Sequence, residues 1–156
     1  MGLGEVSVLR LCFGLFFIVL MGCGRTPTPE EKQEFTPYLQ RFVQHSNQRG
    51  RPVSGDLNIV YGSFKGSHLG MCDEGWLRSS HVEINRDAWR TASEPTREMM
   101  LFHELGHCLL GRSHLDEEAN LKNYRIPASV MNTHGVSGSL YQRFQNYYLN
   151  ELFSGG

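Results

Sequence analysis

The sequence predicts a small α+β domain with a few-stranded mixed sheet. Three observations support this fold class. The 156-residue chain is 40% hydrophobic and 20% charged, as in one ordinary globular domain, which excludes a disordered chain and several domains. Apolar residues recur at helical spacing in three segments and alternate with polar ones in two short segments. The net charge of -1 comes without a basic patch, so we expect no nucleic-acid partner.

The beginning of the chain is expected to be an export leader. Residues 11–21 are apolar and follow Arg10; this run is about half of the ~20 residues that a membrane-spanning helix needs, and it is typical of a secretory signal. The next residues, Leu20-Met21-Gly22-Cys23, resemble the lipobox of bacterial lipoproteins, although Met21 replaces the usual small residue. The resemblance implies that a lipid such as palmitate is attached to Cys23. The alternative is a plain secretory signal with a chance cysteine.

This interpretation divides the chain into three parts. Residues 1–22 would be the lipoprotein signal peptide, residues 23–34 a lipid-linked tether, and residues 35–156 the folded domain. The protein would then be held on a membrane of the bacterial cell envelope, facing the periplasm or the exterior. In that oxidising compartment Cys72 and Cys108 could form a disulfide, and two buried free thiols are the alternative.

The first half of the domain is predicted to contain one helix and two strands. Thr28 is an N-cap and Pro29 takes the first helical position of a helix over residues 29–47. Residues 57–61 form a strand that ends at a glycine, and residues 81–85 alternate and form a second strand. The Gly, Ser and Asp content of residues 62–75 predicts a loop between these strands.

The second half is predicted to be mainly helical. Ser93 and Pro95 begin a helix that Gly111 ends after Leu110, and its apolar residues form one broad buried face. Aromatic and aliphatic residues recur at three and four positions from Leu140 to Leu152, which predicts an amphipathic C-terminal helix.

The chemistry is concentrated in the helix that precedes Gly111. It contains His103-Glu104-Leu105-Gly106-His107. Two histidines four residues apart project from one side of a helix, so their nitrogens can converge on one Zn²⁺. Glu104 can reach a zinc-bound water without ligating the metal. His114 follows Gly111 by three residues and is the first choice for a third ligand.

These residues resemble the zincin metallopeptidases, and most closely the metzincins, whose pattern is H-E-x-x-H-x-x-G-x-x-H. Here one extra residue stands between His107 and Gly111, which rotates the exit from the helix by about 100°. Acidic side chains therefore compete with His114 as third ligand. The three candidates are Asp116, Glu117 and Glu118. The resemblance implies a zincin-like domain with an active-site helix and a Met-turn, for which Ser129-Val130-Met131-Asn132 fits; the alternative is that Met131 only fills the core.

The resemblance also implies a function. Zn²⁺ on His103, His107 and His114 would activate a water, with Glu104 as general base, so we expect a zinc endopeptidase that cleaves a peptide or protein substrate. A second group often assists by binding the carbonyl oxygen, and the candidates are Tyr124, His134 and Tyr141. The strand at residues 81–85 is expected to bind substrate by strand addition, and the protein is expected to be a monomer.

Three other interpretations compete with the endopeptidase. A non-catalytic zinc-binding surface lipoprotein would not need Glu104. A zinc amide hydrolase that acts on cell-wall peptides would use the same site. In the third interpretation, His103 and His107 are packed core histidines without a metal.

Overall fold

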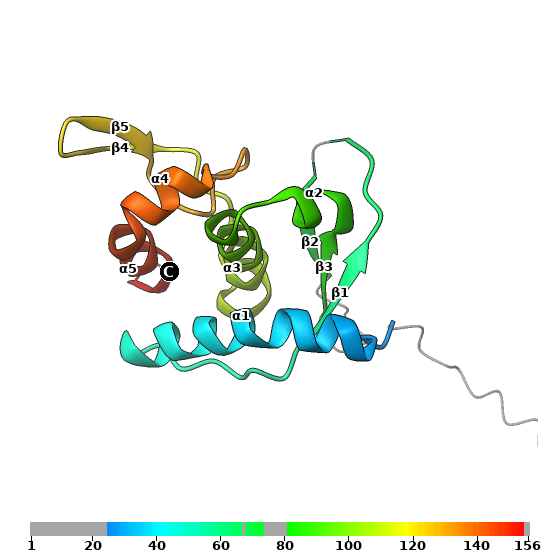
Figure 1. Cartoon of the computed structure of the whole chain (residues 1–156). Coiled ribbons are helices and arrows are strands. Elements are labelled where there is room, and N and C mark those ends of the chain that lie inside the picture. Colours follow the sequence, from blue (N-terminus) through cyan, green and yellow to red (C-terminus); the bar gives the residue numbers. More distant parts are fainter. Residues whose placement is uncertain (1–24, 67, 74–80, 155–156) are drawn as a thin grey trace, which may run out of the picture.

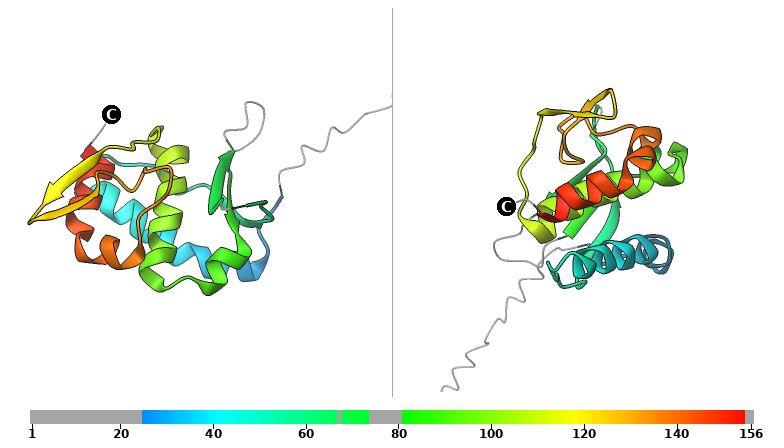
Figure 2. Two further views of the ribbon diagram at one scale, coloured as in Figure 1. Left: turned by 90° about the horizontal axis from the view of Figure 1, so that it is seen from above. Right: turned by 90° about the vertical axis from the view of Figure 1, so that its left-hand side faces the viewer.

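The computed structural model describes residues 25–66, 68–73 and 81–154, and the predicted leader and Cys23 lie outside them. It confirms a small mixed α+β fold with few strands. Helix α3 (Glu94–Leu110) runs through the middle of the molecule, between the main sheet and the C-terminal helices, and α1 (Pro29–Gln48) crosses one side of all three (Figures 1 and 2). No helix in the described ranges combines the length and the apolar character needed to cross a bilayer.

Helix α1 begins at the residue that the sequence predicts. Thr28 caps it by accepting a hydrogen bond from the N–H of Glu31, whose carboxylate bonds back to the N–H of Thr28. Glu31 is buried, and its carboxylate also accepts from the N–H of Tyr61 at 2.9 Å. Residues 29–34, which the sequence assigned to the tether, are therefore the first turns of a helix packed on the sheet.

The main sheet has three strands in the order β1-β3-β2. Strand β1 (Asn58–Gly62) runs parallel to β3 (His81–Asn85), and β2 (Gly70–Asp73) pairs antiparallel with β3. The loop predicted over residues 62–75 is wrong at its C-terminal end, because β2 lies there. Strand β2 contains a glycine and an aspartate, which are poor strand formers, so its pairing with β3 rather than its composition makes it a strand.

Three further parts of the fold differ from the sequence prediction. A short helix, α2 (Arg86–Thr91), follows β3 directly, capped by the side chain of Asn85. A hairpin of β4 (Glu118–Leu121) and β5 (Tyr124–Pro127) turns at Lys122 and Asn123, both at positive φ. The predicted C-terminal helix is two helices, α4 (Gly138–Arg143) and α5 (Gln145–Ser154), which meet at Phe144.

The core is one continuous apolar cluster around α3. Helix α3 contributes more buried apolar side chains than any other described element, and its Phe102 packs edge-to-face on Phe42 of α1 at 5.1 Å between ring centroids. Ile84 of β3 and Leu152 of α5 are also fully buried in the cluster. Helix α3 is thus held from three directions, which fixes the direction of the partly exposed side that carries His103 and His107.

Candidate metal centre and active-site cleft

Helix α3 ends in a turn that brings a third histidine back to the first two. Gly111 adopts a left-handed conformation with φ 62°, and the N–H of Arg112 donates to the carbonyl of Gly106 at 3.0 Å. This reversal offsets the extra residue before Gly111. The Nε2 atoms of His103, His107 and His114 consequently lie 3.2 Å from one another in all three pairs.

That spacing fits a metal ion. Three nitrogen ligands at ~2.0–2.1 Å around a tetrahedral ion lie about 3.3–3.4 Å apart. Within the described part of the chain, these three histidines are the group of potential ligands close enough together to hold an ion. The chemistry of the donors and their separation both suit a bound divalent cation.

None of the acidic residues after His114 joins the two histidines of the helix. Both oxygens of Asp116 accept hydrogen bonds from Thr133, at 2.7 Å from its N–H and 2.8 Å from its hydroxyl. Glu118 pairs with Arg125 across the hairpin, and Glu117 is exposed. The structure therefore brings His114, and none of these carboxylates, to the other two histidines.

Backbone carbonyl groups orient two of the imidazole rings. Nδ1 of His103 donates to the carbonyl of Val130 at 2.7 Å, and Nδ1 of His107 donates to that of Arg112 at 2.5 Å. A proton held on Nδ1 leaves the lone pair of Nε2 free to bind a metal. Burial, with help from His107 and His114, lowers the pKa of His103 to about 4 against the opposing effect of the Val130 bond. The ring of His103 is therefore neutral at physiological pH.

Met131 lies in a turn that packs against α3 at Gly106. The N–H of Asn132 donates to the carbonyl of Ser129 at 3.3 Å, which closes a turn over residues 129–132. Met131 is fully buried there, and a Cβ added at Gly106 would lie 2.5 Å from its Sδ. The helix needs a glycine at this position so that the turn can approach it.

Glu104 occupies a buried position beside the histidines. Burial raises the pKa of its carboxyl to about 7, against the opposing effect of the Cys72 N–H, which donates to it. A Cβ at Gly70 would lie 2.8 Å from Oε1 of Glu104, so only glycine allows β2 to pass this close. The sequence does not identify Gly70 as part of the site, because it is one of several glycines in a segment that is predicted to be a loop.

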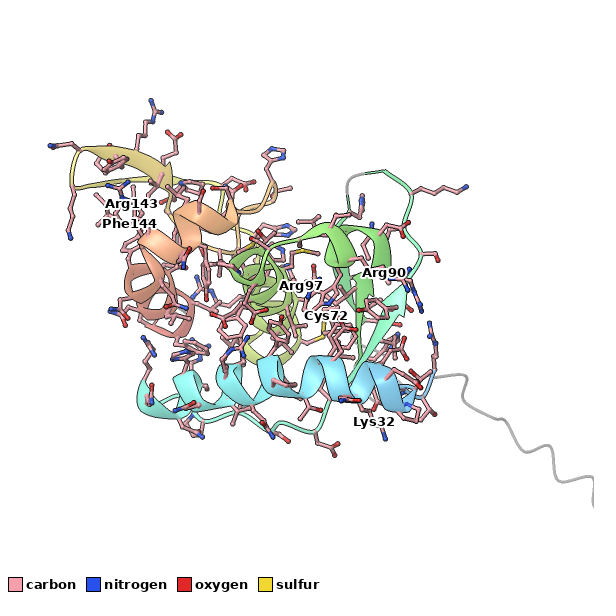
Figure 3. All side chains as sticks on the ribbon, in the orientation of Figure 1. Lys32, Cys72, Arg90, Arg97, Arg143 and Phe144 are labelled. Carbon is pink, nitrogen blue, oxygen red and sulfur yellow. A yellow bond between two sulfur atoms is a disulfide. The ribbon has the colours of Figure 1, made fainter. Side chains whose placement is uncertain are left out.

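The histidines and Glu104 line a cleft of about 800 Å³ whose opposite wall is β2. A disulfide between Cys72 and Cys108, with Cα atoms 5.5 Å apart, links β2 to α3 (Figure 3). The predicted role of residues 81–85 as the substrate strand is wrong, because β3 is the central strand and both its edges are paired. Among the described strands, β2 is the edge that lines the cleft.

Only one of the three proposed assisting groups lies at the cleft. His134 lines it, next to Gly135. Tyr141 is buried and its hydroxyl donates to Glu98 at 3.0 Å. Tyr124 lies on the hairpin, where Arg143 covers its ring at 4.3 Å; Figure 3 shows Arg143 below the hairpin, away from α3. The structure thus removes Tyr124 and Tyr141 from the candidates.

A histidine triad and a buried glutamate that line one cleft together with a strand edge fit a metal-dependent hydrolase. The profile of a protein family described as "Putative phage metallopeptidase" matches residues 31–141, more than two thirds of the chain. The protein belongs to this metallopeptidase family. Comparisons with curated proteins and with solved structures gave no match.

Proposed function

We propose that the protein is a zinc-dependent endopeptidase. The observation that carries this proposal is the triangle of His103, His107 and His114 nitrogens, with sides of 3.2 Å, beside the buried Glu104. Three imidazole nitrogens suit Zn²⁺ and leave a fourth position open, as in catalytic zinc sites. The same helix and the Met131 turn make a zincin-like, metzincin-type site the best description.

Zinc held by the three histidines would supply a Lewis acid that activates water and polarises the peptide carbonyl. Glu104 would accept the proton of the attacking water on its carboxylate and then deliver it to the leaving nitrogen. A pKa of about 7 suits a group that must both take and give a proton near neutral pH. His134, on the rim of the cleft, would donate to the carbonyl oxygen as negative charge develops there.

The edge of β2 would bind the substrate as an added strand. The N–H of Asn85 donates to the carbonyl of Leu69, so this pair is hydrogen-bonded across the two strands. Because such pairs alternate in an antiparallel ladder, the backbone groups of Gly70 and Cys72 point away from β3. Cys72 gives its N–H to Glu104, which leaves the carbonyl of Cys72 and both backbone groups of Gly70 facing the cleft. An extended peptide that pairs with them would pass directly over Glu104.

The experiment measures zinc content and cleavage of unfolded casein by wild type and by Glu104→Gln. We expect one zinc per chain in both proteins and a loss of at least about 100-fold in kcat for the variant. Glu117→Gln is the matched control, because Glu117 is exposed and its side chain is outside the cleft. Full activity in Glu104→Gln would contradict the assignment of the base.

A parallel assay with cross-linked cell-wall peptides separates the endopeptidase from an amide hydrolase of the cell wall. Cleavage of these peptides but not of casein would favour the amide hydrolase. If a zinc-loaded wild type cleaves neither substrate, the proposed activity is wrong and the result favours the non-catalytic zinc-binding lipoprotein.

We also propose that the enzyme is a monomer anchored to the bacterial envelope by lipid on Cys23. Arg25, two residues after Cys23, donates to the carbonyl of Tyr61 at 2.5 Å and pairs with Glu31 at 2.8 Å. A lipid at Cys23 would therefore hold the domain close to the bilayer. The lipid anchor is tested by incorporation of labelled palmitate, which should occur in wild type but not in Cys23→Ser. The monomeric state is tested by light scattering of the detergent-free domain.

A further inference from the structure

The two carbonyl groups that orient the metal-binding rings come from different loops. The carbonyl of Arg112, in the turn after α3, accepts from Nδ1 of His107 at 2.5 Å. The carbonyl of Val130, in the Met131 turn, accepts from Nδ1 of His103 at 2.7 Å. The relative position of these two loops therefore determines whether both Nε2 atoms point to the same place.

One side chain of the C-terminal helix contacts both loops. Oε1 of Glu151 pairs with the guanidinium of Arg112. Its Oε2 accepts a hydrogen bond from the hydroxyl of Ser129, the residue before Val130. Ser129 Oγ in turn accepts from the N–H of Met131 at 3.0 Å. One carboxylate thus connects the two loops whose carbonyl groups orient the rings of His107 and His103.

The guanidinium of Arg112 is fixed on its other side as well. Its Nη1 donates to the carbonyl groups of Glu151 and Leu152, at 3.0 Å each, at the end of α5. The side chains of Arg112 and Glu151 are only 11% and 18% exposed, and Ser129 is fully buried. With so little exposure, the pair is weakly screened by solvent and its geometry is well defined.

Stability alone does not explain an ion pair at this position. Desolvation of two charges offsets much of their attraction. Apolar side chains of similar volume often stabilise a buried site at least as much as an ion pair does. A carboxylate provides two acceptors at a fixed separation, which apolar groups cannot. Here one acceptor serves each loop.

We propose that Glu151 is a positioning residue of the metal centre. It fixes the carbonyl groups of Arg112 and Val130, and through them the orientation of His107 and His103. Glu151 lies ten residues beyond the segment that matches the family, residues 31–141, so the proposal extends the functional unit to α5. It rests on the metal site of the proposed function but not on peptidase activity.

The test compares Glu151→Gln with Glu98→Gln in the full chain. Glu98 is also a buried glutamate; it pairs with Arg41 of α1 at 2.6 Å and accepts from Tyr141 of α4 at 3.0 Å. Both partners lie outside the two loops that carry the carbonyl groups of Arg112 and Val130. We measure zinc affinity by competition with a chelator and the visible absorption of the Co²⁺-substituted site. Thermal midpoints of the metal-free proteins report stability separately.

We expect Glu151→Gln to weaken zinc binding about 10-fold and to change the Co²⁺ spectrum. This is the lower end of the range for loss of a direct partner of a metal ligand, because Glu151 acts through such partners. Glu98→Gln should lower the thermal midpoint without changing zinc affinity. Equal zinc affinity in Glu151→Gln and wild type, or an equal loss of affinity in both variants, would overturn the proposal.

A milder variant covers the case in which Glu151→Gln does not fold. Ser129→Ala removes both bonds of the Ser129 hydroxyl, to Glu151 and to the N–H of Met131, and leaves the Arg112 side intact. The ¹⁵N shifts of metal-free protein should therefore report a changed Nδ1–H state for His103 and an unchanged one for His107. Unchanged shifts for both rings would refute the positioning role. This measurement needs no bound zinc, so it decides the role of Glu151 even if the proposed peptidase activity fails.

Discussion

The two walls of the cleft are built in different ways. Helix α3 has 17 residues, ends in a left-handed turn at Gly111 and is surrounded by the core on its buried side. Strand β2 has four residues, pairs with β3 along one edge, and is joined to α3 by the Cys72–Cys108 disulfide. The helix wall carries two of the three candidate metal ligands and the proposed base, whereas the strand wall offers the backbone groups that we propose to bind a substrate. Metal binding and substrate binding should therefore respond to different mutations.

The largest effect should come from the metal side of the cleft. His114→Ala removes one of the three nitrogens and should lower zinc affinity by at least about 100-fold, with loss of measurable cleavage. Asp116→Asn is the control, because both oxygens of Asp116 bond to Thr133. Chelator competition measures both affinities. A larger loss in Asp116→Asn than in His114→Ala would show that the carboxylate is the third ligand.

A change on the strand wall should reduce cleavage but leave zinc in place. In Gly70→Ala the new Cβ would lie 2.8 Å from Glu104 and 2.9 Å from the carbonyl of Glu83, so β2 or Glu104 must move. We expect a loss of about 10–100-fold in kcat/KM, since a displacement of about 1 Å near the reacting atoms has this effect.

Gly55→Ala is the matched control for that variant, because its Cβ would lie 3.4 Å from Val43, an ordinary contact. Steady-state kinetics and zinc analysis of both variants separate the two walls. A Gly70→Ala enzyme that loses its zinc would mean that the walls are not independent.

Removal of the disulfide should affect stability more than chemistry. The bond closes a loop with a sequence separation of 36, and its loss in Cys72→Ser/Cys108→Ser should lower the free energy of unfolding by about 2–4 kcal/mol. Urea titration measures this loss, and wild type in dithiothreitol should behave like the double variant. Identical unfolding midpoints for wild type and the double variant would contradict the expected contribution of the bond.

The smallest effect concerns pH. The raised pKa of Glu104, about 7 against 4.5, means that the folded protein keeps a proton that the unfolded chain releases between these values. Stability of the chelator-treated protein should therefore fall as pH rises from 4.5 to 7, by about 1–3 kcal/mol relative to Glu104→Gln. The lowered pKa of His103 acts with the opposite sign, but it is common to both proteins and cancels in the difference. Parallel pH curves for the two proteins would refute this prediction.

Helices and strands whose stabilising residues lie within their own segment are predicted well from the sequence, and those that depend on distant segments are not. Helices α1 and α3 have their caps and apolar faces within their own segments, and both agree with the sequence prediction to within one residue. Strand β2 depends on pairing with a segment about ten residues further on, and its Gly70 and Asp73 argue against a strand. Helix α2 depends on one cap, Asn85, inside what the sequence presents as the end of a strand.

The residues of the site also divide into those that local spacing predicts and those that depend on distant contacts. His103, Glu104 and His107 are set by helical spacing, which can be read directly. His114 needs the reversal at Gly111, whose geometry a sequence cannot give. Gly70, Ser129 and Glu151 act through contacts between distant segments, and no local pattern distinguishes them from ordinary loop or surface residues.

The disulfide has a further consequence for an enzyme that cuts protein chains. It encloses every residue between Cys72 and Cys108, including Glu104 and two of the three candidate metal ligands, in one covalent ring. A single backbone cut anywhere in this ring opens it but leaves both fragments attached to each other. A molecule nicked there by a neighbouring copy would still run as one band without reductant and as two bands with it. The ring therefore keeps a nicked enzyme in one piece.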